Sequence, residues 1–217
     1  LMGCSITTCL LMAGHPVVAV APVSVDLTFA LKRITKHLQR SRREKLVTQA
    51  PDFYLQHLHI TESYDQLQGC ALVIECTLEN LDIKKSVYSK IEAVIDKNAL
   101  LASNTSAIPI SILQQQTTHP SRFFGLHWAE PSHTTRFLEV ICGNESDIAK
   151  GEYLYELSHL WGKEPTLVRK DIRGFITNRI MYAMYREAIS LVEQGYATVE
   201  DVDRACRNNA GYWMTLV

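Results

Sequence analysis

The sequence has no long hydrophobic run, no excess of charge of one sign and no closely paired cysteines. No apolar stretch reaches the ~18 residues that a membrane-spanning helix requires. The first residues also lack the basic start of a secretory signal peptide, so we expect a cytoplasmic protein without a membrane partner. The 22 basic and 23 acidic residues leave a net charge of -1, which argues against nucleic acid as a partner because phosphate binding needs a clustered basic excess.

The cysteines show no C-x-x-C pair and no spacing with histidine that is typical of a metal site; they are Cys4, Cys9, Cys70, Cys76, Cys142 and Cys206. We therefore expect free thiols in a reducing compartment and no metal. The basic residues at 40, 42, 43 and 45 lie in a polar helical stretch. We interpret them as a solvated helix face, the alternative being a phosphate site.

What the chain does contain is an alternation of short β-branched runs with helical periods. Strands are expected at 15–21, 71–76, 99–104, 122–128, 136–142 and 165–170, and helices at 3–13, 26–49, 81–95, after Pro109 and at 148–160. Strands that alternate with helices predict a parallel, doubly wound α/β sheet of the Rossmann type. From Phe175 onward only helical periodicity remains. We predict an α/β dinucleotide-binding domain at 1–170 and a partial helical domain at 171–217, with "DIRG" as the hinge.

The start of the chain is also informative about a nucleotide site. A dinucleotide-binding sheet begins with a strand that runs into a G-x-G-x-x-G turn, whose backbone donors hold a pyrophosphate. Gly3, after Met2, fits the third glycine of that turn, with the first strand and two glycines absent from the numbered chain. Ala21 stands where such a site usually presents an acid to the ribose. No Arg or Lys occurs at 22–30, which favours NAD over NADP, with backbone groups and Ser24 at the adenosine end.

The segment "LHWAEPSHTTRFLEV", residues 126–140, places a histidine and a glutamate at the near ends of two strand-like runs. A hairpin-like turn between these runs would bring His127 and Glu139 side by side. The alternative is a surface histidine and an unrelated strand glutamate. Both interpretations are compatible with these residues alone.

Several ordered segments carry a family resemblance: "MGCSITTCLLMAGHPV", "VIECTLENLDIKK", "ASNTSAIPIS", "RFFGLHWAEP", "RFLEVI", "GKEPTLVRKDIRGFITNRI" and "REAISLVEQGYATVEDVD". In this order and at this spacing they resemble the L-3-hydroxyacyl-CoA dehydrogenase family across residues 3–211. The resemblance implies NAD-dependent oxidation of a 3-hydroxyl on L-3-hydroxyacyl-CoA. It also implies a place in fatty acid metabolism and a homodimer.

The resemblance also implies catalytic roles. His127 would take the proton from the substrate hydroxyl, a task that suits imidazole because its unperturbed pKa lies near neutrality. Glu139 would hold the tautomer of the ring and stabilise the imidazolium. Ser106 would hydrogen-bond the reacting oxygen, although it could also be a helix N-cap. Asn178 would approach the substrate from the helical domain, the alternative being an exposed helix residue.

Further residues are assigned to the cofactor by the same resemblance. They are Met2, Gly3, Glu79, Lys84 and Asn104, of which Glu79 and Lys84 would line the nicotinamide side of the cleft. For Lys84 the other interpretation is a plain surface lysine on a helix.

One position departs from the family pattern. Where the family reads H-F-F-N-P, this chain has "HWAEP", so Glu130 replaces an asparagine and becomes a candidate substrate-binding residue. Its carboxylate could raise the pKa of the histidine or meet a cation on the substrate. Dehydrogenases of other hydroxy acids, of the carnitine or gulonate type, therefore stay open as alternatives. A non-catalytic, crystallin-like relative is the alternative from another class.

Overall fold

The computed structural model describes residues 1–21 and 24–211, and of residues 24–26 only the backbone. The predictions for the Ser24 side chain and for residues 212–217 lie outside this part of the chain. Two compact units are present, Leu1–Phe175 and Ile176–Val217.

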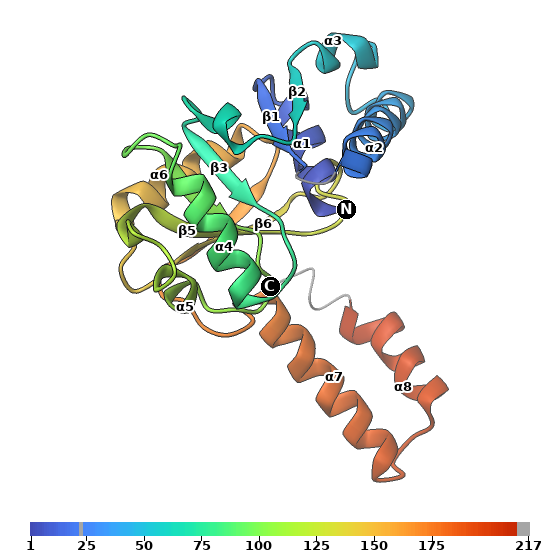
Figure 1. The fold of residues 1–217 in the computed structure, drawn as a ribbon. Helices are drawn as coiled ribbons and strands as arrows, with labels where there is room; N and C mark the ends of the chain where they lie inside the picture. The colour runs from blue at the N-terminus through green and yellow to red at the C-terminus, as the bar shows by residue number, and fades with distance from the viewer. Residues whose placement is uncertain (22–23, 212–217) are drawn as a thin grey trace. The chain divides into compact units, whose positions relative to one another are not determined.

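The first unit contains two sheets (Figure 1). A parallel pair joins β1 (Val17–Val20) to β2 (Leu58–Thr61), and a five-stranded sheet has the order β3 (Leu72–Glu75), β4 (Leu100–Ser103), β5 (Phe123–Trp128), β6 (Phe137–Cys142) and β7 (Glu164–Val168). The doubly wound fold is confirmed, and β5 and β6 form the hairpin considered for these two runs. β6 runs antiparallel to β5 because residues 129–136 join the two strands directly, a connection too short for a helical crossover.

Helices flank the strands along the chain: α1 (Met2–Met12), α2 (Ser24–Arg43), α3 (Pro51–Leu55), α4 (Leu81–Glu92), α5 (Ile110–Gln114) and α6 (Ile148–His159). α2 ends before the predicted residue 49 because Lys45 adopts a left-handed conformation, with φ 61°, and the Leu46 N–H donates to the Ser41 carbonyl. Neither α3 nor β2 was expected from the sequence, because both are too short to show a periodicity.

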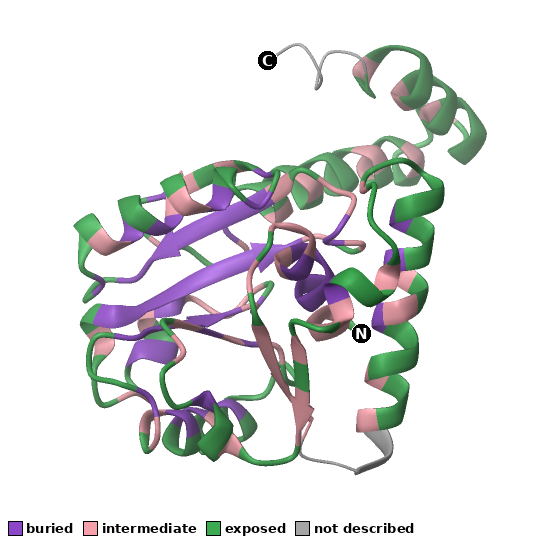
Figure 2. Cartoon of the chain, turned by 90° about the horizontal axis from the view of Figure 1, so that it is seen from above, coloured by how far each residue is buried: buried purple, intermediate pink, exposed green. Residues whose placement is uncertain are grey.

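Two apolar cores lie on opposite faces of the five-stranded sheet. Successive side chains of a strand point to opposite faces, so Phe123 packs with α4 and α5 while Phe124 packs with α1 and α6. Both phenylalanines are fully buried. β4 and β5 are buried along their whole length, and Figure 2 shows buried strands next to helices whose outer sides are exposed. Helices on both faces leave the carboxyl ends of the strands as the open edge at which such sheets bind ligands.

The second unit is helical, as predicted, with α7 (Thr177–Glu193), α8 (Val199–Ala205) and one π-helical turn (Cys206–Ala210). No residue of α7 is buried, although its sequence is strongly amphipathic. No helix within residues 1–21 and 24–211 is both long enough and apolar enough to cross a membrane.

Candidate active site

The histidine and the glutamate of the hairpin lie together. His127 and Glu139 are direct partners in the antiparallel β5–β6 ladder, so their side chains share one face of the sheet. His127 Nδ1 lies 2.7 Å from Glu139 Oε2, and the side chains are only 9% and 1% exposed. The predicted juxtaposition is confirmed, and the alternative of two unrelated residues is wrong. Because the glutamate engages Nδ1, Nε2 is the nitrogen left for a proton from a ligand.

Two phenylalanine rings fix the plane of this imidazole. Phe137 meets the His127 ring edge to face at a centroid distance of 5.4 Å, and Phe175 lies at 5.6 Å with an interplanar angle of 53°. Phe175 is fully buried and has a φ of 50°, directly after Gly174 with a φ of 78°. This left-handed turn directs the Phe175 ring onto the histidine, where it excludes water from one side.

Hydrogen bonds to the side chains of Glu79 and Asn104 hold the loop that carries Ser106. Glu79 Oε1 accepts hydrogen bonds from the Ser106 and Ala107 N–H groups at 3.0 and 3.2 Å, and also from the Thr105 hydroxyl. Asn104 Oδ1 accepts from the Trp128 N–H at 3.0 Å, which ties the same loop to β5 beside the histidine. Ser106 is exposed. The N-cap interpretation of Ser106 was wrong, since α5 has Pro109 at that position.

Lys84 is not a surface residue, so that alternative was also wrong. Its side chain is 1% exposed, and Nζ lies 2.9 Å from Glu75 Oε2 and 3.4 Å from Glu79 Oε2. Glu75 also accepts from the Ser103 and Tyr88 hydroxyls at 2.8 and 3.0 Å. Burial alone would raise the pKa of Glu75, but Lys84 and the hydrogen bonds outweigh it and hold this pKa below its ordinary value.

Sequence reasoning missed Glu75, Tyr88 and Ser103, which complete this buried polar network. The signal that could have found Glu75 is a charged residue at the end of an otherwise apolar strand, because such residues are rarely buried without a partner.

Glu130 lies in the connection between β5 and β6. It is exposed, and its charge raises the pKa of His37 of α2, where burial acts more strongly in the opposite direction. His37 stacks on His133 with ring centroids 4.4 Å apart. His133 Nδ1 lies 3.1 Å from the Ser5 hydroxyl oxygen, which also accepts from the Ser132 N–H. The turn after β5 is thereby fixed to α1 and α2, and a role of Glu130 towards the substrate stays a prediction.

Burial determines the protonation of His133. Its side chain lies among cationic groups, and desolvation, followed by the charges of His37, Arg40 and Lys163, lowers its pKa to about 4. His133 is therefore neutral at neutral pH.

The start of α1 can hold an anionic group. No side chain caps this helix and no acidic residue lies in its first turn, so the backbone N–H groups near Met2 and Gly3 favour a pyrophosphate. A Cβ added at Gly3 would lie 3.8 Å from the Cys76 Cβ, an ordinary contact. Ala21 follows β1 and brings no carboxylate to a ribose, while its N–H donates to the Thr61 carbonyl.

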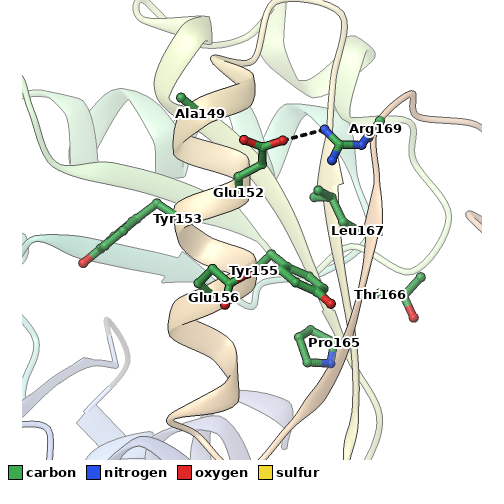
Figure 3. A pocket seen from close by; sticks show the side chains of 9 residues that line it. All are labelled: Ala149, Glu152, Tyr153, Tyr155, Glu156, Pro165, Thr166, Leu167 and Arg169. Atoms are coloured by element: carbon green, nitrogen blue, oxygen red, sulfur yellow. Dashed lines mark hydrogen bonds and ion pairs between the residues drawn. The ribbon is translucent and has the colours of Figure 1, made fainter.

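One hollow of the described structure lies elsewhere. An open groove of about 800 Å³ runs between α6 and β7, and its lining includes Tyr153, Tyr155 and Pro165 (Figure 3). Glu152 and Arg169 form an ion pair across it at 2.7 Å. None of the predicted site residues lines this groove, so we place the site by the carboxyl ends of the strands.

A doubly wound sheet with a buried histidine–carboxylate pair at its ligand-binding edge defines a dinucleotide-binding protein of the dehydrogenase class. Comparison with models of known protein families identifies the family within this class. The NAD-binding domain of 3-hydroxyacyl-CoA dehydrogenase matches residues 1–172, and the C-terminal domain of 3-hydroxyacyl-CoA dehydrogenase matches residues 174–217. The chain belongs to the 3-hydroxyacyl-CoA dehydrogenase family and contains its NAD-binding domain.

Individual relatives differ in their substrates. The 5-formyl-3-hydroxy-2-methylpyridine 4-carboxylate 5-dehydrogenase of Mesorhizobium japonicum is 38% identical over 153 residues, which cover 70% of this chain and 50% of that protein. The mitochondrial hydroxyacyl-coenzyme A dehydrogenase of Homo sapiens is 31% identical over 221 residues, covering 99% of this chain and 70% of that protein. The crystal structure of (S)-3-hydroxybutyryl-CoA dehydrogenase from Ralstonia eutropha superposes with a TM-score of 0.91 at 28% identity, covering 96% of this chain and 74% of that one.

Proposed function

We propose that the protein is an NAD-dependent dehydrogenase that oxidises the 3-hydroxyl of an L-3-hydroxyacyl-CoA to the 3-keto compound. The observation that carries this proposal is the 2.7 Å hydrogen bond between His127 and Glu139 at the carboxyl end of β5. An imidazole oriented by a carboxylate at the ligand-binding edge of an NAD-binding domain has the geometry of a general base.

Four residues of the chain have a task in this reaction. His127 Nε2 accepts the hydroxyl proton while Glu139 stabilises the imidazolium that forms. Bound NAD supplies the acceptor for the hydride that leaves the carbon of the hydroxyl group. Ser106 donates a hydrogen bond to the reacting oxygen, and Asn178 contacts the substrate. These last two roles rest on the family resemblance.

The remaining predicted residues serve the cofactor. Met2 and Gly3 present backbone N–H groups to the pyrophosphate at the start of α1. Glu79, Lys84 and Asn104 surround the loop at the end of β4, where they shape the nicotinamide side of the site. The carboxylate of Glu79, whose side chain is 40% exposed, suits an oxidised, cationic nicotinamide ring.

A second candidate is a related dehydrogenase that acts on another hydroxy compound. Two observations favour it: the 38% identity with the Mesorhizobium japonicum enzyme and the replacement of the family asparagine by Glu130. The choice between the candidates is a question of substrate, since both use the same base and the same cofactor.

We also propose that the protein is a cytoplasmic homodimer. Ile180, Met184 and Leu191 leave an apolar stripe exposed on α7, and a second copy of the chain would remove it from water.

The proposed function is tested in two steps. NAD+ is first titrated while protein fluorescence is recorded, and saturable binding is expected. NADH formation is then measured with L-3-hydroxybutyryl-CoA, with 5-formyl-3-hydroxy-2-methylpyridine 4-carboxylate and with L-carnitine or L-gulonate. The highest kcat/KM is expected with the acyl-CoA. A preference for one of the other compounds selects the second candidate, and no NAD+ binding would leave a non-catalytic relative of the crystallin type.

A further inference from the structure

Glu75 is a carboxylate buried without any exposed side-chain surface at the carboxyl end of β3. Its Oε1 accepts from the Thr77 hydroxyl at 2.6 Å and from Lys84 at 3.0 Å. Its Oε2 accepts from Lys84, Ser103 and Tyr88 at 2.8 to 3.0 Å. Every oxygen of this carboxylate is therefore engaged by protein donors, and the group has one position.

Lys84 connects this fixed carboxylate to Glu79. Its ammonium group is held by both oxygens of Glu75 and reaches Glu79 Oε2 at 3.4 Å. The side chain of Glu79 is 40% exposed, so this residue brings the network into contact with solvent. An exposed glutamate would sample several rotamers by itself, and the buried ammonium group selects one of them.

Glu79 in turn holds the loop after β4. Its other oxygen accepts from the Ser106 and Ala107 N–H groups. The Asn104 N–H donates to the Glu75 carbonyl at 2.8 Å, and the Asn104 side chain binds the Trp128 N–H. A continuous path of polar contacts thus runs from Glu75 to the backbone next to His127.

Stability alone does not account for this arrangement. Burying an ion pair costs desolvation that the attraction between the charges only partly offsets, and an apolar pair of similar volume is often as stable. We propose that Glu75 is a positioning residue, which acts through Lys84 and Glu79 to hold the loop of residues 104–107 in the geometry that binds the cofactor and the reacting oxygen. The proposal rests on the proposed function for its kinetic consequences, but not for its effect on the loop.

Three variants separate the effect of Glu75 on the loop from its effect on the stability of the protein. Glu75→Gln removes the nearer and fully buried of the two carboxylates that pair with Lys84 and should lower Tm by about 10 °C. Glu75→Gln combined with Lys84→Met removes both buried charges and should recover most of that loss. Glu92→Gln is the matched control, because Glu92 is a buried partner of Arg122 at 3.7 Å that also accepts from the Thr118 N–H, and it has no contact with the loop.

The readouts are hydrogen exchange of the Ser106 and Ala107 amides, NAD+ affinity by fluorescence titration, and the split between kcat and KM. In both Glu75 variants these amides should exchange faster, NAD+ should bind about 3- to 30-fold more weakly, and kcat should fall by about 10- to 100-fold. Glu92→Gln should lower Tm and change none of the three.

The double variant decides the matter. If it regains Tm together with wild-type amide exchange and wild-type NAD+ affinity, Glu75 is structural only and the proposal is overturned. If the wild-type protein binds no NAD+, the proposed function fails, while amide exchange in the double variant still confirms or refutes the positioning of the loop.

Discussion

The ring of Phe175 lies against the imidazole of His127, at a centroid distance of 5.6 Å, from a backbone held in the left-handed conformation. We expect Phe175→Ala to lower the free energy of unfolding by about 3 to 5 kcal/mol, because it opens a cavity beside a fully buried site. Urea unfolding measures this loss. Phe29→Ala, at a position 61% exposed, is the control and should stay within about 0.5 kcal/mol of wild type. An equal effect of the two substitutions would contradict the packing role.

Removal of the base should abolish most turnover. His127→Gln is expected to lower kcat by about 100- to 10,000-fold, the range for loss of a general base. NAD+ affinity by fluorescence titration should stay unchanged, since the histidine lies on the side of the hydroxyl group. His119→Gln, outside the site, serves as the control. A His127→Gln variant with near wild-type kcat would remove the catalytic assignment.

Glu139 should contribute to kcat because it selects the tautomer of His127 and stabilises its protonated form. Glu139→Gln keeps the size of the side chain but presents an amide to His127 Nδ1, so the ring loses the charge that stabilises the imidazolium. We expect kcat to fall about 10- to 1,000-fold with little change in KM. Stopped-flow single-turnover measurement separates this chemical step from product release. A change confined to KM would contradict this role of Glu139.

The neutral state of His133 makes stability depend on pH. Its pKa is lowered from 6.5 to about 4 in the folded protein, so the unfolded chain binds the proton more readily. This contribution is therefore complete above pH 6.5 and is lost as pH falls towards 4, up to about 3 kcal/mol. Urea unfolding at several pH values measures the slope. His133→Asn, which cannot titrate, should have a flatter profile in this window, and an identical profile would contradict the assignment.

Burial lowers the pKa of His37, and the charge of Glu130 opposes this shift. Glu130→Asn should therefore lower the pKa of His37, which an NMR titration of the histidine rings can follow. The same variant tests the substrate, since weaker use of a cationic hydroxy acid would place Glu130 in the binding site. An unaltered pH profile of kcat/KM together with unaltered substrate preference would leave the acyl-CoA assignment without a competitor on this ground.

The α7 stripe should determine assembly. Ile180, 52% exposed, is the most exposed residue of this stripe, and Ile180→Lys places a charge there. We expect wild-type protein to scatter light as a dimer at micromolar concentration and the variant to shift towards a monomer. Glu193→Lys, at an exposed position on the opposite side of the same helix, is the control. A wild-type protein that is a clean monomer would contradict the homodimer.

The helices and most strands could be predicted from the sequence because their periods are local properties of side-chain placement. The runs at 71–76 and 99–104 became β3 and β4, and the amphipathic period after Phe175 became α7. β2 escaped prediction because its four residues form a strand only through pairing with β1.

For the site, the sequence by itself placed His127 and Glu139 at the near ends of two strand-like runs, and the antiparallel register of β5 and β6 decided that they face each other. Only the tertiary structure decided that Lys84 is buried, that Glu75 holds it and that Phe175 covers the base. Those contacts join residues from different strands, helices and loops. No local period encodes them, because a hydrogen bond or a ring contact depends on distance in space and not on distance along the chain.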